Sequence, residues 1–337
     1  MSAKKSIENH MRGTLVQVAR LYHEGGLSQQ EIANRLGVSR SLIAQYLQRA
    51  KEAGIVRIQI VDPDDACVDL ATSLEKAAGV KQVTVIPNPH GSRELALRAV
   101  ASAAANFLSE SLDDGDTLGL AWGRTTSLVV DSLKLPHAGS IDVLPLMGES
   151  GHSGMHSQMN QLVMRAAEHL HATPYFLSLP MVVSSAGLRD ALLREAGICE
   201  VIDRWNKVNL ACVGIGVVPP VPGMVVYIGE EHLPQLAAAG AVGDVCGIYY
   251  DKEGRIIESG LEDQMIAVSM DQLKAIDYLV AVACGVDKAT SVLGALRTGL
   301  ISALFIDQDT AEQILAGISM AKRAAAPGSR AVAKQET

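Results

Sequence analysis

The sequence predicts an α/β protein with a small helical domain at the N-terminus and a larger domain built on a parallel sheet. Its 337 residues exceed one typical domain. Apolar residues recur at helical spacing through most of the first 54 residues. Beyond residue 65, short continuous apolar runs alternate with helical segments. That alternation is typical of parallel strands covered by helices on both faces.

The charge is divided unevenly between these two parts. The whole chain has a net charge of −8, but residues 1–60 carry nine Lys/Arg against four Asp/Glu, a balance of +5. The remainder therefore carries −13. A basic N-terminal part can approach phosphate groups, while an acidic remainder disfavours non-specific wrapping of nucleic acid.

Residues 28–51 predict a helix-turn-helix, preceded by a supporting helix over residues 9–24. Ser28 and Glu31 have the spacing of a capping box. Gly37 supplies the residue that can adopt φ > 0 in the sharp turn. Ser39 can cap the second helix. The residues expected to be buried in this pair are Ile32, Ala33, Leu36, Val38, Leu42, Ile43, Tyr46 and Leu47.

The open face of the second helix carries residue types that read DNA bases. Arginine pairs with guanine, glutamine pairs with adenine, and alanine can touch a thymine methyl group. A strand over residues 55–61 would add a wing, from which Arg57 could reach phosphate. The alternative is an ordinary helical hairpin with a polar outer face. The expected DNA-binding residues are Gln29, Ser39, Arg40, Ser41, Ala44, Gln45, Gln48, Arg49 and Arg57.

The run Asp62-Pro63-Asp64-Asp65 marks the expected boundary between domains 1–61 and 62–337. Helices are expected over residues 67–78 and 92–111, and a hairpin inserted in the main sheet over 245–258. Residues 324–337 have the composition of a frayed tail. Strands are expected over residues 83–86, 117–122, 141–146, 175–179, 210–218, 278–284 and 304–306.

Three segments follow predicted strands, where ligands bind in a sheet of this kind. In residues 122–127, glycine would let the backbone approach a ligand, and the hydroxyl groups suit an anionic or polyhydroxylated compound, or simply cap a helix. Lys288 is either a phosphate contact or a surface lysine. The Gly- and Ser-rich residues 148–154 could close over a ligand. Asp244 could bind sugar hydroxyls or form a turn.

The five cysteines are widely spaced, so no metal site, disulfide framework or cofactor is expected. The N-terminus lacks the apolar core of a signal peptide, and no apolar run approaches the length of a membrane span. We therefore expect a cytoplasmic protein with reduced thiols.

The sequence resembles the SorC/DeoR-type family of sugar-binding bacterial transcriptional regulators over nearly its whole length. The resemblance is carried, in order, by GLSQQEIANRLGVSRSLIAQYLQRAKEAGIVRIQI, GDTLGLAWGRT, GAVGDVCGIYYDKEG and ACGVDKATSVLGALRTGLISALFIDQDTA. It implies a winged helix-turn-helix and an effector domain with the Rossmann-like fold of sugar-phosphate isomerases. It also implies operator binding as a tetramer or dimer of dimers, with a phosphorylated sugar as effector.

The matching blocks also imply which residues bind the effector. Residues 148–158 depart from the family, because they are rich in Ser, Met and His and no arginine stands at 148–154 to take a second phosphate. This departure favours a monophosphate or a neutral polyol over a bisphosphate. The implied effector-binding residues are Gly123, Arg124, Thr125, Thr126, Gln158, Asn160, Asp244 and Lys288.

These observations favour a non-enzymatic regulator of a carbohydrate or polyol catabolic operon. One alternative is a sugar-phosphate isomerase or deaminase with an appended helix-turn-helix, in which Asp244, Glu149 or His152 would supply acid/base groups. A further alternative is a small-molecule sensor that acts through a protein partner.

Overall fold

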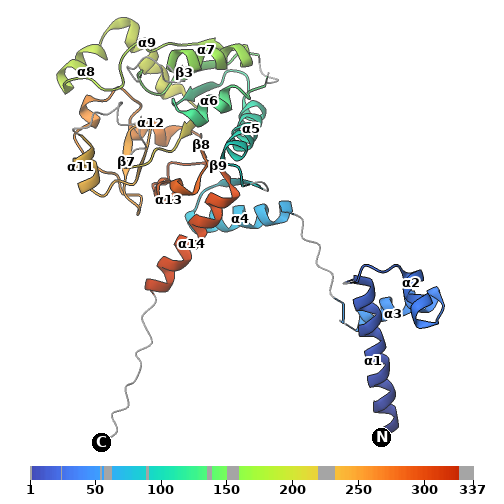
Figure 1. Ribbon diagram of the computed structural model, residues 1–337. Helices are drawn as coiled ribbons and strands as arrows, with labels where there is room; N and C mark the ends of the chain where they lie inside the picture. The colour runs from blue at the N-terminus through green and yellow to red at the C-terminus, as the bar shows by residue number, and fades with distance from the viewer. Residues whose placement is uncertain are drawn as a thin grey trace, which may run out of the picture. The chain divides into compact units, whose positions relative to one another are not determined.

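Contacts between residues divide the chain into two compact units, Met1–Asp62 and Pro63–Thr337. The computed structural model describes residues 2–23, 25–53, 55–56, 63–88, 91–134, 139–149, 159–218 and 232–325 (Figure 1). Each unit is described by itself.

The N-terminal unit contains α1 (Ser2–His23), α2 (Gln29–Leu36) and α3 (Arg40–Glu52). The predicted capping box is confirmed: Glu31 donates its amide to Ser28 Oγ at 3.3 Å, and Ser28 donates its amide to the Glu31 carboxylate at 2.8 Å. Gly37 ends α2 with φ 68°, and Ser39 Oγ accepts a hydrogen bond from the Leu42 amide. The helix-turn-helix therefore forms from the local signals that predicted it.

The core of this unit is small and aliphatic. Ile32, Ala33, Ile43 and Leu47 are buried together with Val18 of α1. Because α1 packs against α3, it supports the helix whose outer face was predicted to read DNA. Arg57 and the rest of the predicted wing strand from residue 57 to residue 61 lie outside the described residues. Residues 55–56, which begin that segment, pack against a second small cluster formed by Leu15, Ala19 and Ala50.

We expect Gly37→Ala to destabilise the protein by about 1–2 kcal/mol, because an L-residue with a Cβ pays that cost in the left-handed region. A Cβ at Gly37 would meet no atom within 4 Å, so backbone strain is the whole effect. Gly13→Ala is the matched control: it also has open space but lies in α1, where alanine should stabilise by about 0.5–1 kcal/mol. Urea unfolding of the full chain, followed by circular dichroism, measures both changes. Equal effects of the two substitutions would contradict the assigned turn geometry.

The C-terminal unit is built on a parallel sheet, which confirms the predicted α/β class. Within the described residues the sheet has seven strands in the order β1-β9-β8-β5-β2-β3-β4, all paired in parallel. Strands β2, β5 and β9 are almost wholly buried, as their continuous apolar sequences require. The strands are β1 (Gln82–Ile86), β2 (Thr117–Leu120), β3 (Asp142–Pro145), β4 (Thr173–Pro174), β5 (Leu210–Gly214), β8 (Tyr278–Ala283) and β9 (Ala303–Asp307).

Helices cover the sheet, and a short hairpin stands beside it (Figure 1). The helices are α4 (Pro63–Ala78), α5 (Arg93–Ser111), α6 (Arg124–Val130), α7 (Met159–Leu170), α8 (Ala186–Leu192), α9 (Ala196–Arg204), α11 (Leu233–Ala238), α12 (Met270–Ala275), α13 (Ala289–Arg297) and α14 (Gln308–Ala325), with 3₁₀ turns η1 (Trp205–Lys207), η3 (Glu262–Gln264) and η4 (Val286–Lys288). The hairpin is β6 (Gly243–Val245) and β7 (Ile248–Tyr250), paired antiparallel.

The strand order reverses between β2 and β5, and this positions the site. From β2 the chain proceeds through β3 to β4 on one side, whereas from β5 it proceeds through β8 to β9 on the other. The two connections leave the sheet in opposite directions, so a crevice opens beyond the carboxyl ends of β2 and β5. Ligands of open α/β sheets bind at such a switch point.

The strand predicted over residues 175–179 is wrong. The strand at that place is β4, which precedes them. Tyr175 still donates its amide to Val143, but the Leu177 amide donates to Asn160 Oδ1 at 3.0 Å. A side chain thus replaces the ladder partner, and pairing stops.

The predicted hairpin is only partly right. The expected turn at residues 251–254 exists, and beyond it a Tyr250–Ile256 bridge is flanked by hydrogen bonds from the Asp251 amide to the Arg255 carbonyl and from the Ile257 amide to the Tyr249 carbonyl. The insertion in the main sheet is wrong: β7 pairs with β6 through a tighter turn at Cys246-Gly247, and the two strands form a separate sheet. The frayed tail was predicted over residues 324–337, and its residues from 326 onward lie outside the described part of the chain.

In the described part of the chain, no helix has the length and apolar character needed to cross a membrane. The five cysteines are free thiols. Among the described residues, His, Cys, Asp and Glu form no group of three that could hold a metal ion.

Candidate functional site

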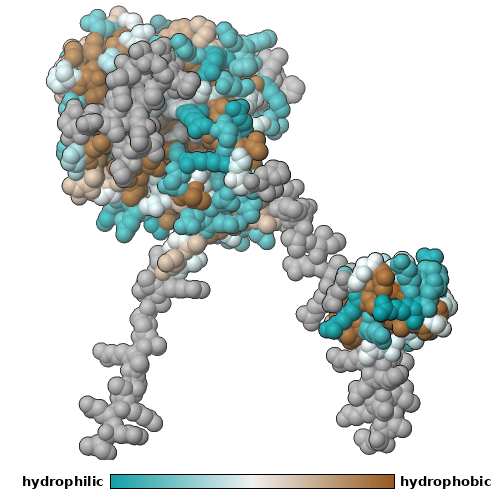
Figure 2. Space-filling model, in the orientation of Figure 1, coloured by the Kyte–Doolittle hydropathy of each residue, from teal (hydrophilic) through white to brown (hydrophobic). Residues whose placement is uncertain are grey.

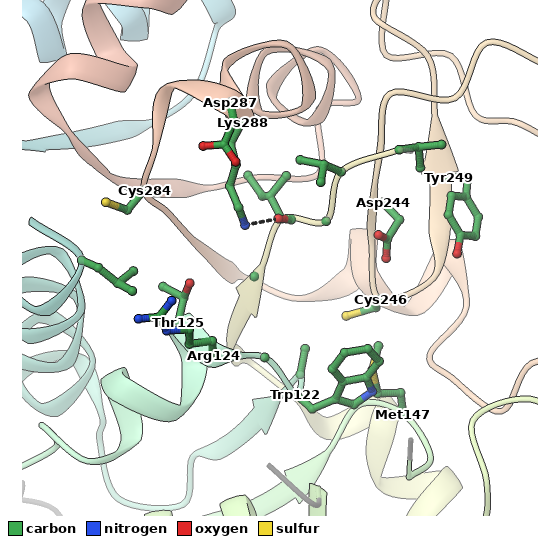
Figure 3. A pocket seen from close by; sticks show the side chains of 18 of the residues that line it. Trp122, Arg124, Thr125, Met147, Asp244, Cys246, Tyr249, Cys284, Asp287 and Lys288 are labelled. Carbon is green, nitrogen blue, oxygen red and sulfur yellow. Dashed lines mark hydrogen bonds between the residues drawn. The ribbon is translucent and has the colours of Figure 1, made fainter. Parts of the chain in front are cut away.

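A cavity of about 270 Å³ lies at the switch point of the sheet. Its walls come from the segments that follow β2, β5 and β8, from the first turn of α5 and from the β6–β7 hairpin (Figure 3). The cavity thus lies where the topology of the sheet predicts a ligand. Five of the predicted effector-binding residues line it: Gly123, Arg124, Thr125, Asp244 and Lys288.

Asp244 is held by the turn of its own hairpin. Cys246 and Gly247 have φ values of 52° and 79°, the two positive angles of a type I′ turn. Asp244 Oδ2 accepts a hydrogen bond from the Gly247 amide at 3.1 Å. On the other side, a Cβ at Gly216 would lie 1.9 Å from Asp244 Oδ1, so only glycine leaves room for this carboxylate. Burial raises the pKa of Asp244, although the Gly247 amide and the charge of Lys288 oppose that change.

Lys288 enters the cavity from the opposite edge (Figure 3). Its Nζ donates a hydrogen bond to the Ile215 carbonyl at 2.7 Å, which fixes the ammonium group at the end of β5. Burial lowers the pKa of Lys288, while Asp287 and Asp244 act in the opposite direction. The ammonium group therefore gains stability from any further negative charge that enters the cavity.

A buried carboxylate fixes the turn that carries Lys288. The Gly285 amide, at φ 115°, donates to Asp307 Oδ1 at 2.8 Å and to Thr310 Oγ1 at 2.9 Å. Asp307 Oδ2 also accepts the Thr310 amide in the first turn of α14. One carboxylate thus joins the end of β8, the end of β9 and the start of α14.

The mouth of the cavity carries two arginines, each paired with an acid. Arg93, in the first turn of α5, lies 3.1 Å from Asp287, and Arg124 pairs with Glu94 of the same turn. Both arginines are largely exposed, so these pairs contribute little to stability and an anion can compete for them. Sequence reasoning missed Arg93, because its place at the mouth depends on β1 lying beside β9; its position at a helix start after a strand was the available signal.

The N-terminal unit presents the predicted DNA-reading face. Arg40, Ser41, Ala44, Gln45 and Gln48 of α3 are exposed. Figure 2 shows hydrophilic residues over this unit on the face in view. Ser39 and Arg49 are also exposed, and Gln29 is partly exposed. None of these side chains belongs to the buried core of the unit.

Comparison with known proteins gives a family match for each unit. A winged helix-turn-helix DNA-binding family matches residues 19–57, and the sugar-binding domain family (Sugar-bind) matches residues 62–316. The chain belongs to the SorC/DeoR-type sugar-binding transcriptional regulators. It is therefore a DNA-binding transcriptional regulator with a sugar-binding domain, as its sequence predicts.

Relatives of this regulator align over most of both chains. The deoxyribonucleoside regulator of Bacillus subtilis is 29% identical over 89% of this chain and 96% of its own. The sorbitol operon regulator of Klebsiella pneumoniae is 27% identical over 89% and 97%. The crystal structure of full-length SorC from Klebsiella pneumoniae superposes with a TM-score of 0.72 at 26% identity, covering 90% of this chain and 98% of that one.

Two of the implied effector-binding residues, Thr126 and Asn160, do not line the cavity. Thr126 is fully buried behind it, in the first turn of α6, and its Oγ1 has no hydrogen-bond partner among the described residues. Asn160 accepts the Leu177 amide and donates to Ser178 Oγ at 3.2 Å, so its amide group holds the segment after β4. Gln158 lies outside the described residues.

Glu149, a candidate acid/base group for an enzyme, caps a helix. Its carboxylate accepts the Met159 amide at 2.7 Å and the Asn160 amide at 3.0 Å, the first two amides of α7. A carboxylate that accepts the free amides at the start of a helix has a structural role. The other candidate, His152, lies outside the described residues.

Proposed function

We propose that this regulator controls a carbohydrate or polyol catabolic operon, and that a sugar monophosphate in the cavity changes its affinity for operator DNA. The observation that carries the proposal is the arrangement of charge around the cavity. Arg124 and Lys288 lie toward one side, with Arg93 beside Asp287, while Asp244 lies across the space (Figure 3). Cations suit a phosphate group, and a carboxylate accepts hydrogen bonds from sugar hydroxyls.

The size of the cavity supports one phosphate and a short carbon chain. A volume of about 270 Å³ lies just below the usual range for drug-sized ligands, so the cavity suits a small metabolite. A neutral polyol would leave three cations without a ligand partner. The names of two relatives, a deoxyribonucleoside regulator and a sorbitol operon regulator, are consistent with a small hydroxylated effector.

DNA recognition would use the open face of α3, with Gln29, Arg49 and Arg57 at phosphate groups. The regulator would act in the cytoplasm as a homotetramer or dimer of dimers, without catalytic turnover. Two heads related by a two-fold axis read symmetric half-sites. The effector shifts DNA affinity only by the difference in its affinity for the two arrangements of the assembly, typically about 1–3 kcal/mol.

Selection of DNA sites from a random pool by the full-length protein tests the regulator function. We expect symmetric sites to be enriched, and at least one sugar monophosphate to change their dissociation constant by roughly 5- to 150-fold. A regulator of this kind should leave the sugar phosphates chemically unchanged. Turnover of a sugar phosphate, or a selected site that responds to no such compound, would contradict the proposal.

The pH dependence of effector binding gives a separate test. The free protein has a lowered Lys288 pKa, and a bound dianionic phosphate favours the charged ammonium, so binding takes up a proton on the alkaline side. Affinity should therefore fall as the pH rises through that lowered pKa. Calorimetric titration at a series of pH values measures this. Lys288→Arg should abolish the alkaline fall, because a guanidinium stays charged; an unchanged fall would show that another group titrates.

A further inference from the structure

We propose that the effector is a terminally deoxygenated sugar monophosphate, whose end farthest from the phosphate carries a methyl group in place of a hydroxymethyl group. This inference rests on the proposed function and adds the chemical class of the ligand. It comes from the wall of the cavity that lies opposite Lys288. Trp122, Met147 and Cys246 lie at this end in Figure 3, and Met181 completes the wall.

Paired backbone segments bring these side chains together. The β2–β3 register pairs Leu120 with Pro145, and its extension by two residues sets Trp122 beside Met147. Met181 comes from the segment after β4, which a bridge joins to Glu149. A Cβ at Gly247 would lie 3.1 Å from Met181 Cε, so this methionine rests on the hairpin turn that carries Cys246.

Backbone groups at this wall are already bonded to one another. Met181 donates its amide to the Glu149 carbonyl at 2.8 Å and accepts the Ile266 amide at 2.7 Å. Gly148 donates in turn to Ile266 at 2.8 Å. The methionine and cysteine side chains add only sulfur atoms, which are weak hydrogen-bond acceptors, and the indole Nε1 of Trp122 is itself buried. A ligand hydroxyl here would lose water without a strong replacement, whereas a methyl group would pack against soft thioethers.

Groups suited to hydroxyls lie elsewhere in the same cavity. Asp244 and Tyr249 stand on one side and Lys288 on the edge opposite the sulfur-lined wall (Figure 3). A ligand held by its phosphate at Lys288 and by its middle hydroxyls at Asp244 would direct its far end to the wall. The cavity therefore distinguishes ligands by that last carbon.

Cys246 is the residue best placed to set this preference. It occupies the first central position of a type I′ turn, where Asn, Asp and Gly are favoured because φ is positive. Cysteine gives up that backbone advantage and presents a small, weakly polar side chain to the cavity. An asparagine would suit the turn and would offer a hydrogen-bonding amide to a hydroxymethyl group.

Calorimetric titration of the full-length protein with matched ligand pairs tests the inference. Suitable pairs are 6-deoxy-D-fructose 1-phosphate with D-fructose 1-phosphate, L-rhamnulose 1-phosphate with L-fructose 1-phosphate, and L-fuculose 1-phosphate with L-tagatose 1-phosphate. We expect the deoxy member of each binding pair to have the lower dissociation constant, by a factor on the order of ten to a hundred. Equal or tighter binding of the hydroxylated members overturns this inference and leaves the proposed function standing. Binding by no member of any pair overturns the inference together with the phosphorylated-effector part of the proposed function.

Cys246→Asn provides the second measurement. This substitution should bring the ratio of the two dissociation constants to one or reverse it; asparagine suits the turn, and circular dichroism checks that the variant is folded, because position 246 is buried. Cys199→Asn is the matched control: Cys199 lies on α9, outside the cavity wall, and its thiol donates to the Leu193 carbonyl. The control should retain the full deoxy preference. An unchanged ratio in a folded Cys246→Asn protein would overturn the role assigned to this wall.

Discussion

The double substitution Arg40→Ala, Gln45→Ala should weaken binding to the selected DNA site by about a hundredfold to a thousandfold. Both side chains are exposed on α3, and each base contact of these types contributes about 1–3 kcal/mol of discrimination. The loss should be largest on the cognate site and small on unrelated DNA, because phosphate contacts remain. Fluorescence anisotropy at fixed salt concentration measures both affinities.

A control substitution separates base reading from general damage to the unit. Asn34 is exposed on α2, away from α3, and Asn34→Ala should change cognate affinity by no more than about twofold. The double variant should also bind the effector normally, because the effector site lies in the other unit. Equal losses on cognate and unrelated DNA would assign α3 to phosphate contacts instead of base recognition.

Lys288→Ala should raise the dissociation constant for a sugar monophosphate by about 10- to 150-fold. A charge-assisted hydrogen bond contributes about 1.5–3 kcal/mol, and the ammonium group is already fixed on the Ile215 carbonyl at the cavity edge. DNA affinity without effector should remain near that of the unchanged protein. Calorimetric titration and anisotropy give the two values.

Arg124→Ala is the informative comparison for Lys288. Its side chain is exposed and paired with Glu94, so its contribution is screened by solvent and should be smaller than that of Lys288. If Arg124→Ala has the larger effect, the phosphate binds at the mouth of the cavity instead of at its inner edge. If both variants still bind the sugar monophosphate as tightly as the unchanged protein does, the proposed ligand carries no phosphate.

The N-terminal unit could be predicted almost residue by residue because its signals are local. A capping box, a glycine with positive φ and a second serine cap each act within four residues. The parallel sheet was also predictable, since its strands are buried and continuously apolar. The absence of a strand after β4 could not be predicted from the sequence. It depends on the Asn160 side chain of α7, which accepts a hydrogen bond from the Leu177 amide, and these two residues are distant in sequence.

The polar residues of the cavity could be predicted from the sequence, but its apolar residues could not. Glycine, lysine and aspartate after strands carry recognisable chemistry, so Gly123, Lys288 and Asp244 could be named from sequence. Met147 and Cys246 resemble ordinary core residues, and only the register of β2 with β3 and the turn of the hairpin show that they face the cavity.

The carboxylate of Asp307 has a mechanical consequence. Because it accepts hydrogen bonds from both the Gly285 amide and the Thr310 amide, it ties the turn that presents Lys288 to the first turn of α14. Helix α14 packs against α4, the first helix that follows the DNA-binding unit in the chain. The turn that carries Lys288 is therefore linked, through Asp307 and α14, to the helix that the chain enters directly after residue 62.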